Sequence, residues 1–191
     1  SAAVVSGLRP GDRIALTTFN HAVTARLALT GAFEAVSAVL DRLSPAGETA
    51  ILDGVHVALM TSQAAPGRSL VILFTDGRDT MSWLQADEVV ESAKRSNAVF
   101  YAVATGGARQ WSVLRDLADT TGGRAVEIEI GADLHGQFER ILQEFRSRYV
   151  LTYTPRGVSE SGFHRLAVRV RRGGLSVKAR PGYVAGGDDR P

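Results

Sequence analysis

The sequence predicts an α/β protein with a doubly wound, mostly parallel sheet, helices on both faces of that sheet, and a C-terminal antiparallel β appendage. Three observations predict this fold class. Strand-like apolar segments alternate with amphipathic helical segments through residue 146. The run Leu70–Phe74 is apolar without a break, as in a central strand that is covered on both faces. The remaining residues change to period-2 alternation, which is typical of antiparallel strands.

The α/β part is expected to hold parallel strands and one antiparallel edge strand. The parallel strands are predicted at Ile14–Phe19, Leu70–Thr75, Ala98–Thr105 and Ala125–Ile130, and the edge strand at Ala22–Leu29. Apolar residues at helical spacing predict helices that begin near Phe33, Ile51, Leu84, Trp111 and Leu134. This order places Leu70–Thr75 in the middle of one sheet.

The charge distribution divides the chain. Residues 1–145 carry 12 basic and 17 acidic side chains, whereas residues 146–180 carry nine basic side chains against Glu160 alone. Such a step marks a module boundary or an interaction face. We therefore expect an α/β domain at 1–146, a β-hairpin appendage at 147–183 and a disordered tail at 184–191. The segments Tyr149–Thr154, Arg165–Arg171 and Leu175–Arg180 carry no helical pattern, and period-2 alternation in the last two predicts antiparallel strands.

Composition and motifs exclude several classes of site. The chain contains no cysteine, which removes disulfides, thiolate zinc sites and cysteine nucleophiles. No apolar run reaches the roughly 18 residues of a membrane-spanning helix. The histidines have no metal-ligand spacing, and no Gly-x-Ser-x-Gly nucleophile motif occurs. Because no catalytic constellation remains, we expect a protein that is not an enzyme.

Two loops carry oxygen ligands at the expected carboxyl ends of the strands, where open α/β sheets bind their ligands. Asp76 follows the most apolar strand, and Thr49 lies in a loop that enters a helix. Their carboxylate and hydroxyl oxygens suit a hard cation such as Mg²⁺. For Asp76 we favour a metal ligand over a turn residue. For Thr49 a ligand and a helix N-cap remain equally open.

Two further carboxylates lie near these candidates in the sequence. Asp53 falls in the first turn of the helix that follows Thr49, so it is expected to support that helix or to stand behind the metal ligands. Asp79 follows Asp76 by three residues. It is expected to be a solvated loop carboxylate or, again, to stand behind the ligands.

The order of these elements and loops resembles a von Willebrand factor A-type domain. The matching segments are Gly47-Glu-Thr49-Ala-Ile-Leu-Asp53 before a helix and Thr75-Asp76-Gly77 after a strand. The tail is similar to the bacterial VWFA-related branch typified in Acidobacteria, through Tyr149-Val-Leu-Thr-Tyr-Thr-Pro and Ala179-Arg-Pro-Gly-Tyr183. The resemblance covers about residues 7–183 and implies a Rossmann-like fold.

The resemblance implies a metal-ion-dependent adhesion site at the top of the sheet. In that family an Asp-x-Ser-x-Ser loop, a Thr and an Asp hold the cation; Thr49 and Asp76 match the last two. The Asp-x-Ser-x-Ser loop and its strand are absent from this sequence. We therefore expect an incomplete site that binds Mg²⁺, Mn²⁺ or Ca²⁺ weakly. We also expect Ile14–Phe19 and Leu70–Thr75 to pair with each other, or another segment or chain to fill the slot between them.

The function implied is a non-enzymatic adhesion or scaffold module that binds another protein. An Asp or Glu carboxylate of the partner would fill the open position on the cation. We expect no nucleic-acid partner and an extracytoplasmic or secreted bacterial location. The chain begins at Ser1 without a Met or a leader, so we expect it to be a piece of a longer polypeptide.

Two other functions stay open from the residues alone. One is an α/β metal-dependent phosphate-handling enzyme that uses Asp76 and Asp79. The other is a structural or nucleic-acid contact through the basic face of the appendage, made by Arg165, Arg169, Arg171, Lys178 and Arg180. For that face we favour a solvated sheet surface over a partner site, because no aromatic side chains are interleaved to stack on bases.

Overall fold

The computed structural model describes residues 5–44, 47–76, 78–105, 111–129 and 131–185. Its elements are β1 (Ile14–Phe19), β2 (Val23–Thr30), α2 (Phe33–Leu40), α3 (Ile51–Gln63), β3 (Leu70–Thr75), α4 (Ala86–Arg95), β4 (Val99–Thr105), α5 (Trp111–Thr121), β5 (Arg124–Ile128), α6 (Leu134–Arg146), β6 (Gly162–Arg165) and β7 (Gly182–Ala185). They form a parallel three-stranded sheet flanked by helices, together with antiparallel pairs. The predicted α/β fold class is confirmed.

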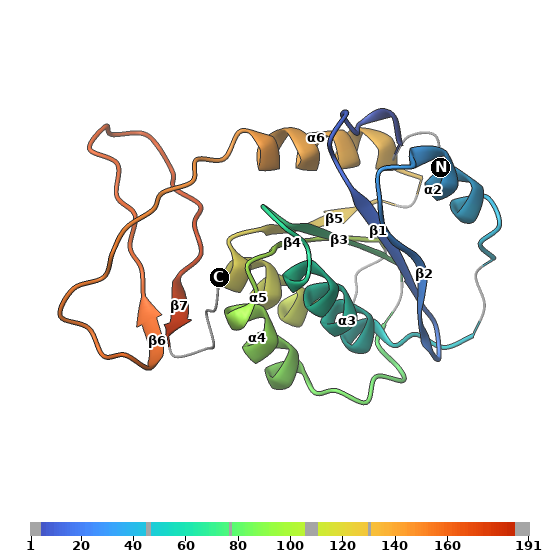
Figure 1. The fold of residues 1–191 in the computed structure, drawn as a ribbon. Coiled ribbons are helices and arrows are strands. Elements are labelled where there is room, and N and C mark those ends of the chain that lie inside the picture. The colour runs from blue at the N-terminus through green and yellow to red at the C-terminus, as the bar shows by residue number, and fades with distance from the viewer. Residues whose placement is uncertain (1–4, 45–46, 77, 106–110, 130, 186–191) are drawn as a thin grey trace.

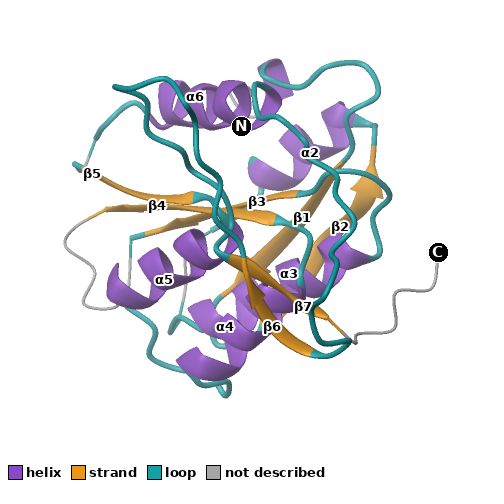
Figure 2. Cartoon of the chain, turned by 90° about the vertical axis from the view of Figure 1, so that its left-hand side faces the viewer, coloured by secondary structure: helices purple, strands orange, loops and turns teal. Residues whose placement is uncertain are grey.

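The parallel sheet has the order β3-β4-β5 and separates two helical layers. Helices α3, α4 and α5 lie on one face, and α6 lies on the other (Figures 1 and 2). Alternate side chains of β4 serve the two layers. Phe100 and Ala102 belong to the core on the α3–α5 side, whereas Tyr101 and Val103 pack with Ile141 of α6. A strand buried on both faces therefore lies at β4.

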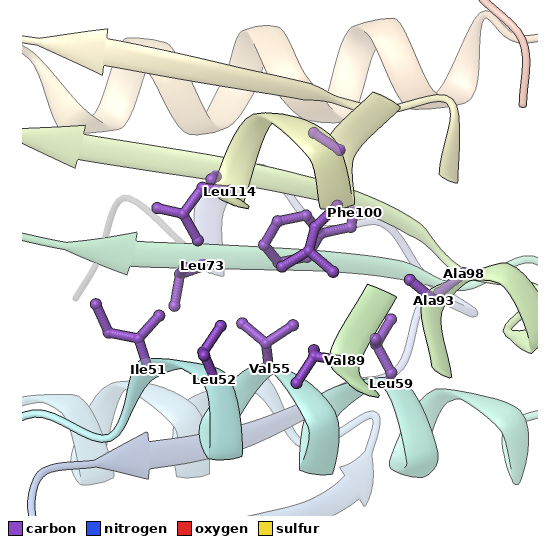
Figure 3. Close-up of a cluster of buried hydrophobic side chains, with 13 residues drawn as sticks. Ile51, Leu52, Val55, Leu59, Leu73, Val89, Ala93, Ala98, Phe100 and Leu114 are labelled. Carbon is purple, nitrogen blue, oxygen red and sulfur yellow. The ribbon is translucent and has the colours of Figure 1, made fainter. Parts of the chain in front are cut away.

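Helix α3 forms because its apolar residues recur on one face. Ile51, Val55 and Leu59 lie four residues apart and are almost fully buried. They point from α3 toward Leu73 of β3 and Phe100 of β4 (Figure 3). Each such side chain contributes about 1.5–3 kcal/mol when it leaves water. This packing fixes the start of α3 beside the end of β3.

The hairpin of β1 and β2 lies against the other side of α3. A Cβ atom at Gly54 of α3 would lie 2.9 Å from the ring of Phe19 in β1, so the helix and the strand touch only because residue 54 has no side chain. Beyond the strand, the amide of Ala50 donates to the carbonyl of Asn20 at 2.8 Å. The end of β1 is therefore fixed next to the beginning of α3.

The prediction that Leu70–Thr75 is a central strand is wrong. Its strand, β3, is an edge of the parallel sheet and pairs only with β4, while β1 pairs only with β2. The expected pairing of Ile14–Phe19 with Leu70–Thr75 does not occur, and no described segment lies hydrogen-bonded between them. An apolar run indicates that the side chains of a strand need burial, but it does not indicate which strands pair with it. At β3 that cover is incomplete, because Phe74 is 38% exposed.

The appendage strands are shorter than predicted. Only β6 and β7 form a ladder, and the segments Tyr149–Thr154, Arg165–Arg171 and Leu175–Arg180 are not strands apart from Arg165. Their apolar side chains face solvent, so no buried face holds the backbones in register. At the C-terminal boundary, Val184 and Ala185 belong to β7 and are not part of a disordered tail. Residues 186–191 lie outside the described residues.

The appendage docks on the α4–α5 side of the sheet (Figure 2). The guanidinium of Arg180 donates to the carbonyl of Lys94 at 3.0 Å and approaches that of Ala93 at 3.5 Å. These carbonyls end α4, where a cation is favoured by the helix dipole. Burial lowers the pKa of Arg180. Lys178 adds an ion pair to Asp119 of α5, with Nζ and Oδ1 2.7 Å apart.

A polar cluster joins the end of α6 to the first half of β4. The buried Tyr101 hydroxyl donates to Oε1 of Glu144 at 2.6 Å, and Arg148 donates to Tyr101 Oη at 2.9 Å. Arg148 also donates to the carbonyl of Gly122 at 2.6 Å. Burial, followed by the hydrogen bond to Glu144, raises the pKa of Tyr101 to about 12. This cluster fixes the chain where it leaves α6 for the appendage.

Candidate functional site

The candidate site is the strand-end edge, which we define as Asn20 and residues 47–53, 75–76 and 78–85. It comprises the turn after β1, the loop into α3, and the loop from β3 to α4. Parallel strands end at the same edge of a sheet, so these loops meet. The start of α3 and the β1–β2 hairpin lie at the right of Figure 1, far from β6 and β7 at the left.

Thr49 is bound to the β3–α4 loop through its backbone. Its amide donates to Oγ1 of Thr80 at 3.0 Å, and its carbonyl accepts from the amide of Thr80 at 2.8 Å. The N-cap of α3 is Ala50, so the N-cap alternative for Thr49 is wrong. Within the described residues, the hydroxyl of Thr49 has no hydrogen-bond partner. Its oxygen is therefore available to another ligand.

Asp79 and Ser82 cap helix α3 from the β3–α4 loop. The amide of Leu52 donates to Oδ2 of Asp79 and to Oγ of Ser82, each at 3.0 Å. The first amides of a helix have no partner within it, and a negative charge there is favoured by the dipole. Asp79 also accepts from the amide of Ser82 at 2.9 Å. The interpretation of Asp79 as a solvated loop carboxylate is therefore wrong.

Asp53 makes the converse contact from α3 to the loop. Its Oδ2 accepts from the amide of Trp83 and its Oδ1 from that of Leu84, both at 3.0 Å. Asp79 of the loop thus binds the helix, and Asp53 of the helix binds the loop. Together they hold residues 79–84 against the start of α3.

Asp76 differs from Asp53 and Asp79 in its contacts. It is exposed, and its carboxylate makes no hydrogen bond within the described part of the chain. The described residues contain no cluster of three or more His, Cys, Asp or Glu side chains that could hold a metal. Thr49 and Asp76 are two ligand side chains, whereas Mg²⁺ takes about six ligands in octahedral geometry. The residues present therefore do not complete a magnesium site.

Comparison with known proteins identifies the fold. The family model of the von Willebrand factor type A domain matches residues 2–140. The chain belongs to this family. No curated protein matches it, and in the described residues no helix is both long and apolar enough to span a membrane.

Solved von Willebrand A domains share the architecture at low sequence identity. A von Willebrand factor type A protein from Catenulispora acidiphila is 20% identical with a TM-score of 0.57, over 75% of this chain and 35% of that chain. An aerotolerance-related membrane protein from Bacteroides fragilis is 14% identical with a TM-score of 0.62, over 77% and 85%. Proximal thread matrix protein 1 from the mussel byssus, with a zinc-occupied MIDAS motif, is 22% identical with a TM-score of 0.60, over 74% and 38%. The chain thus spans about a third of the length of the first of these.

Several residues of this von Willebrand A domain edge carry no sequence motif that marks them. Thr80 and Ser82 become visible only through their contacts with Thr49 and α3. A hydroxyl residue shortly before a helix is a weak general signal for such a contact. Trp83 projects from the same loop and is 88% exposed.

The basic residues of the appendage divide into two groups. Lys178 and Arg180 contact α5 and the end of α4 in the same chain, which leaves them occupied within the von Willebrand A domain. Arg165, Arg169 and Arg171 are exposed. This second group presents its charge to solvent, and Lys178 stays partly exposed in its pair with Asp119.

Proposed function

We propose that this von Willebrand A domain is a non-enzymatic adhesion or scaffold module that binds another protein at the strand-end edge. The observation that carries the proposal is a pair of reciprocal contacts. Asp53 of α3 accepts amides of the β3–α4 loop, and Asp79 of that loop accepts an amide of α3. These contacts hold residues 79–84 against the start of α3 while Asp76, nearby in the chain, stays exposed. A rigid surface loses little conformational entropy when a partner binds.

Within this proposal, Thr49 and Asp76 are the chain's own ligands for a divalent cation. A hydroxyl and a carboxylate suit Mg²⁺, Mn²⁺ or Ca²⁺. An Asp or Glu carboxylate of the partner would complete the coordination. The likeness to a mussel protein with a zinc-occupied MIDAS motif supports a cation at this edge of the fold. Asp53 and Asp79 would stand behind these ligands, because their oxygens already accept backbone amides.

The same contacts weigh against the phosphate-handling enzyme. That function requires Asp79 as a metal ligand beside Asp76. In the structure Asp79 uses both carboxylate oxygens to bind amides of α3 and of its own loop. Asp79 therefore acts as a cap of helix α3, and its oxygens are already used.

An extracytoplasmic bacterial location is part of the proposal. It is supported by the similar fold of an aerotolerance-related membrane protein from Bacteroides fragilis. Protease added to cells whose cytoplasmic membrane is intact and whose outer layers are permeabilised distinguishes the two locations: cleavage of the protein is expected for an envelope location, and protection would indicate a cytoplasmic one.

Calorimetric titration with Mg²⁺ and Mn²⁺ tests the cation. We expect the present chain to bind with a Kd on the order of millimolar or weaker, because two ligand side chains compete poorly with water. A chain extended by a strand that ends in Asp-x-Ser-x-Ser should bind more tightly, and Asp76→Ala should abolish that gain. Asp87→Ala, an exposed carboxylate in the first turn of α4, is the matched control. Tight Mg²⁺ binding by the present chain, or an unchanged gain in Asp76→Ala, would contradict this proposal.

A further inference from the structure

The strand-end edge presents a large apolar side chain on a rigid loop. Trp83 is 88% exposed and Met81 is 46% exposed. Every amide from Thr80 to Gln85 donates a hydrogen bond: the first two to Thr49, the next to Asp79, the following two to Asp53 and the last to Glu88. An exposed tryptophan held this way fits an anchor residue of a protein interface, where tryptophan is enriched.

A second exposed apolar surface lies on the appendage. Tyr149 is 93% exposed, Leu151 71% and Tyr153 53%. The ring of Tyr153 meets that of Tyr183 edge to face at 6.3 Å, and Tyr183 stacks on His164 at 5.1 Å. Tyr153 therefore lies beside β7, next to the ring stack that Tyr183 makes with His164 of β6. We call Tyr149–Tyr153 with Arg165, Arg169 and Arg171 the appendage surface.

The two surfaces carry opposite charge. Residues 1–145 have a net charge of −5 and residues 146–180 one of +8. Around the β3–α4 loop the exposed charged residues are mostly acidic: Glu48, Asp76, Asp87 and Glu88 against Arg78. Complementary charge steers association and fixes the pairing of surfaces.

The two surfaces cannot meet within one molecule. The start of α3, which carries the strand-end edge, lies at one end of the molecule, and β6 and β7 lie at the other (Figure 1). Lys178 and Arg180, which anchor the appendage to α4 and α5, keep it there. Because the strand-end edge cannot reach the appendage surface of its own molecule, it can bind the appendage surface of a second copy.

We propose that the strand-end edge of one copy docks on the appendage surface of a second copy. Trp83 inserts between the apolar side chains of Tyr149–Tyr153, and the acidic residues around it face Arg165, Arg169 and Arg171. The contact joins unlike surfaces, so it produces head-to-tail chains or closed rings. It requires no cation and goes beyond the proposed function.

Sedimentation velocity over a concentration series tests the association. We expect the wild-type chain to assemble at high concentration and to dissociate as salt is raised, because salt screens the exposed charges. Trp83→Ser should weaken assembly at least about tenfold, while Met60→Ser, a matched change at an exposed methionine of α3, should leave it unchanged. Circular dichroism checks that both variants fold. A wild-type chain that is monomeric at every concentration, or a Trp83→Ser chain that assembles like wild type, overturns the proposal.

A mixing experiment tests the head-to-tail geometry. Trp83→Ser disables docking by the strand-end edge and leaves the appendage surface intact. The triple variant Arg165→Glu, Arg169→Glu, Arg171→Glu disables the appendage surface and leaves the strand-end edge intact. Each alone should be monomeric, and an equimolar mixture should form a dimer that cannot grow. A mixture that stays monomeric overturns the proposal. Assembly should persist in EDTA; its loss there would assign the contact to the cation site instead.

Discussion

Asp53 and Asp79 exchange contacts across the strand-end edge. Asp79 Oδ2 accepts the amide of residue 52 in α3, and Asp53 Oδ2 accepts the amide of residue 83 in the loop, each at 3.0 Å. Each carboxylate thus satisfies backbone donors of the segment that carries the other. The helix start and the β3–α4 loop should therefore gain or lose order together.

Removal of the helix cap should destabilise the protein. Asp79→Ala leaves the amide of Leu52 with Ser82 alone, and loss of a cap costs about 0.5–2 kcal/mol. Because both side chains share one donor, Asp79→Ala and Ser82→Ala together should cost more than the sum of the single changes. Urea unfolding measures the three free energies. The exposed Asp87→Ala is the control, and additive costs would show that the two acceptors act independently.

Gly122→Ala should release the appendage. Gly122 has φ +75°, and a Cβ atom there would lie 2.7 Å from the backbone nitrogen of Arg180. The strain and the clash predict a loss of about 1–3 kcal/mol in the free energy of unfolding. Hydrogen exchange at residues 178–182 should rise at the same time. Gly173→Ala, with nothing within 4 Å of its Cβ position, should change neither; equal protection in Gly122→Ala would refute the prediction.

Arg180 should contribute more to docking than Lys178. Arg180→Ala leaves the last carbonyls of α4 without their buried donor, at a cost of about 1–3 kcal/mol. Lys178 and Asp119 form an exposed pair, and such pairs contribute at most about 1 kcal/mol. Limited proteolysis of residues 147–161, which join α6 to β6, would report undocking. The order of the two effects would reverse if the ion pair were the main anchor.

Stability should fall at high pH because of Tyr101. Its pKa is raised from 10.0 to about 12, so the folded state retains a proton that the unfolded state releases. The stabilisation is complete below pH 10 and is lost as pH rises toward 12. Thermal melts in this window measure the slope. Tyr101→Phe should be less stable at neutral pH and should show a flatter decline; an identical slope would exclude Tyr101 as its source.

Much of the α/β part could be predicted because its signals are local. The apolar spacing predicted a helix that begins near Ile51, where α3 begins in the structure, since Ile51, Val55 and Leu59 fall on one face of any helix built from this segment. The positions of Thr49 and Asp76 at strand ends also follow from chain order. Whether these two residues bind a cation stays a prediction.

What the sequence by itself determined is the fold class and the type of each helix and strand in the α/β part, because periodicity and turn residues act within a few positions along the chain. Only the tertiary structure decided that β3 is a sheet edge, that the alternating segments around Val168 and Val177 form no ladder, and that Asp79 caps α3. The amide of Leu52 finds Asp79 across 27 residues. Such a contact depends on how α3 packs beside the end of β3, and a pattern of neighbouring residues carries no record of that packing.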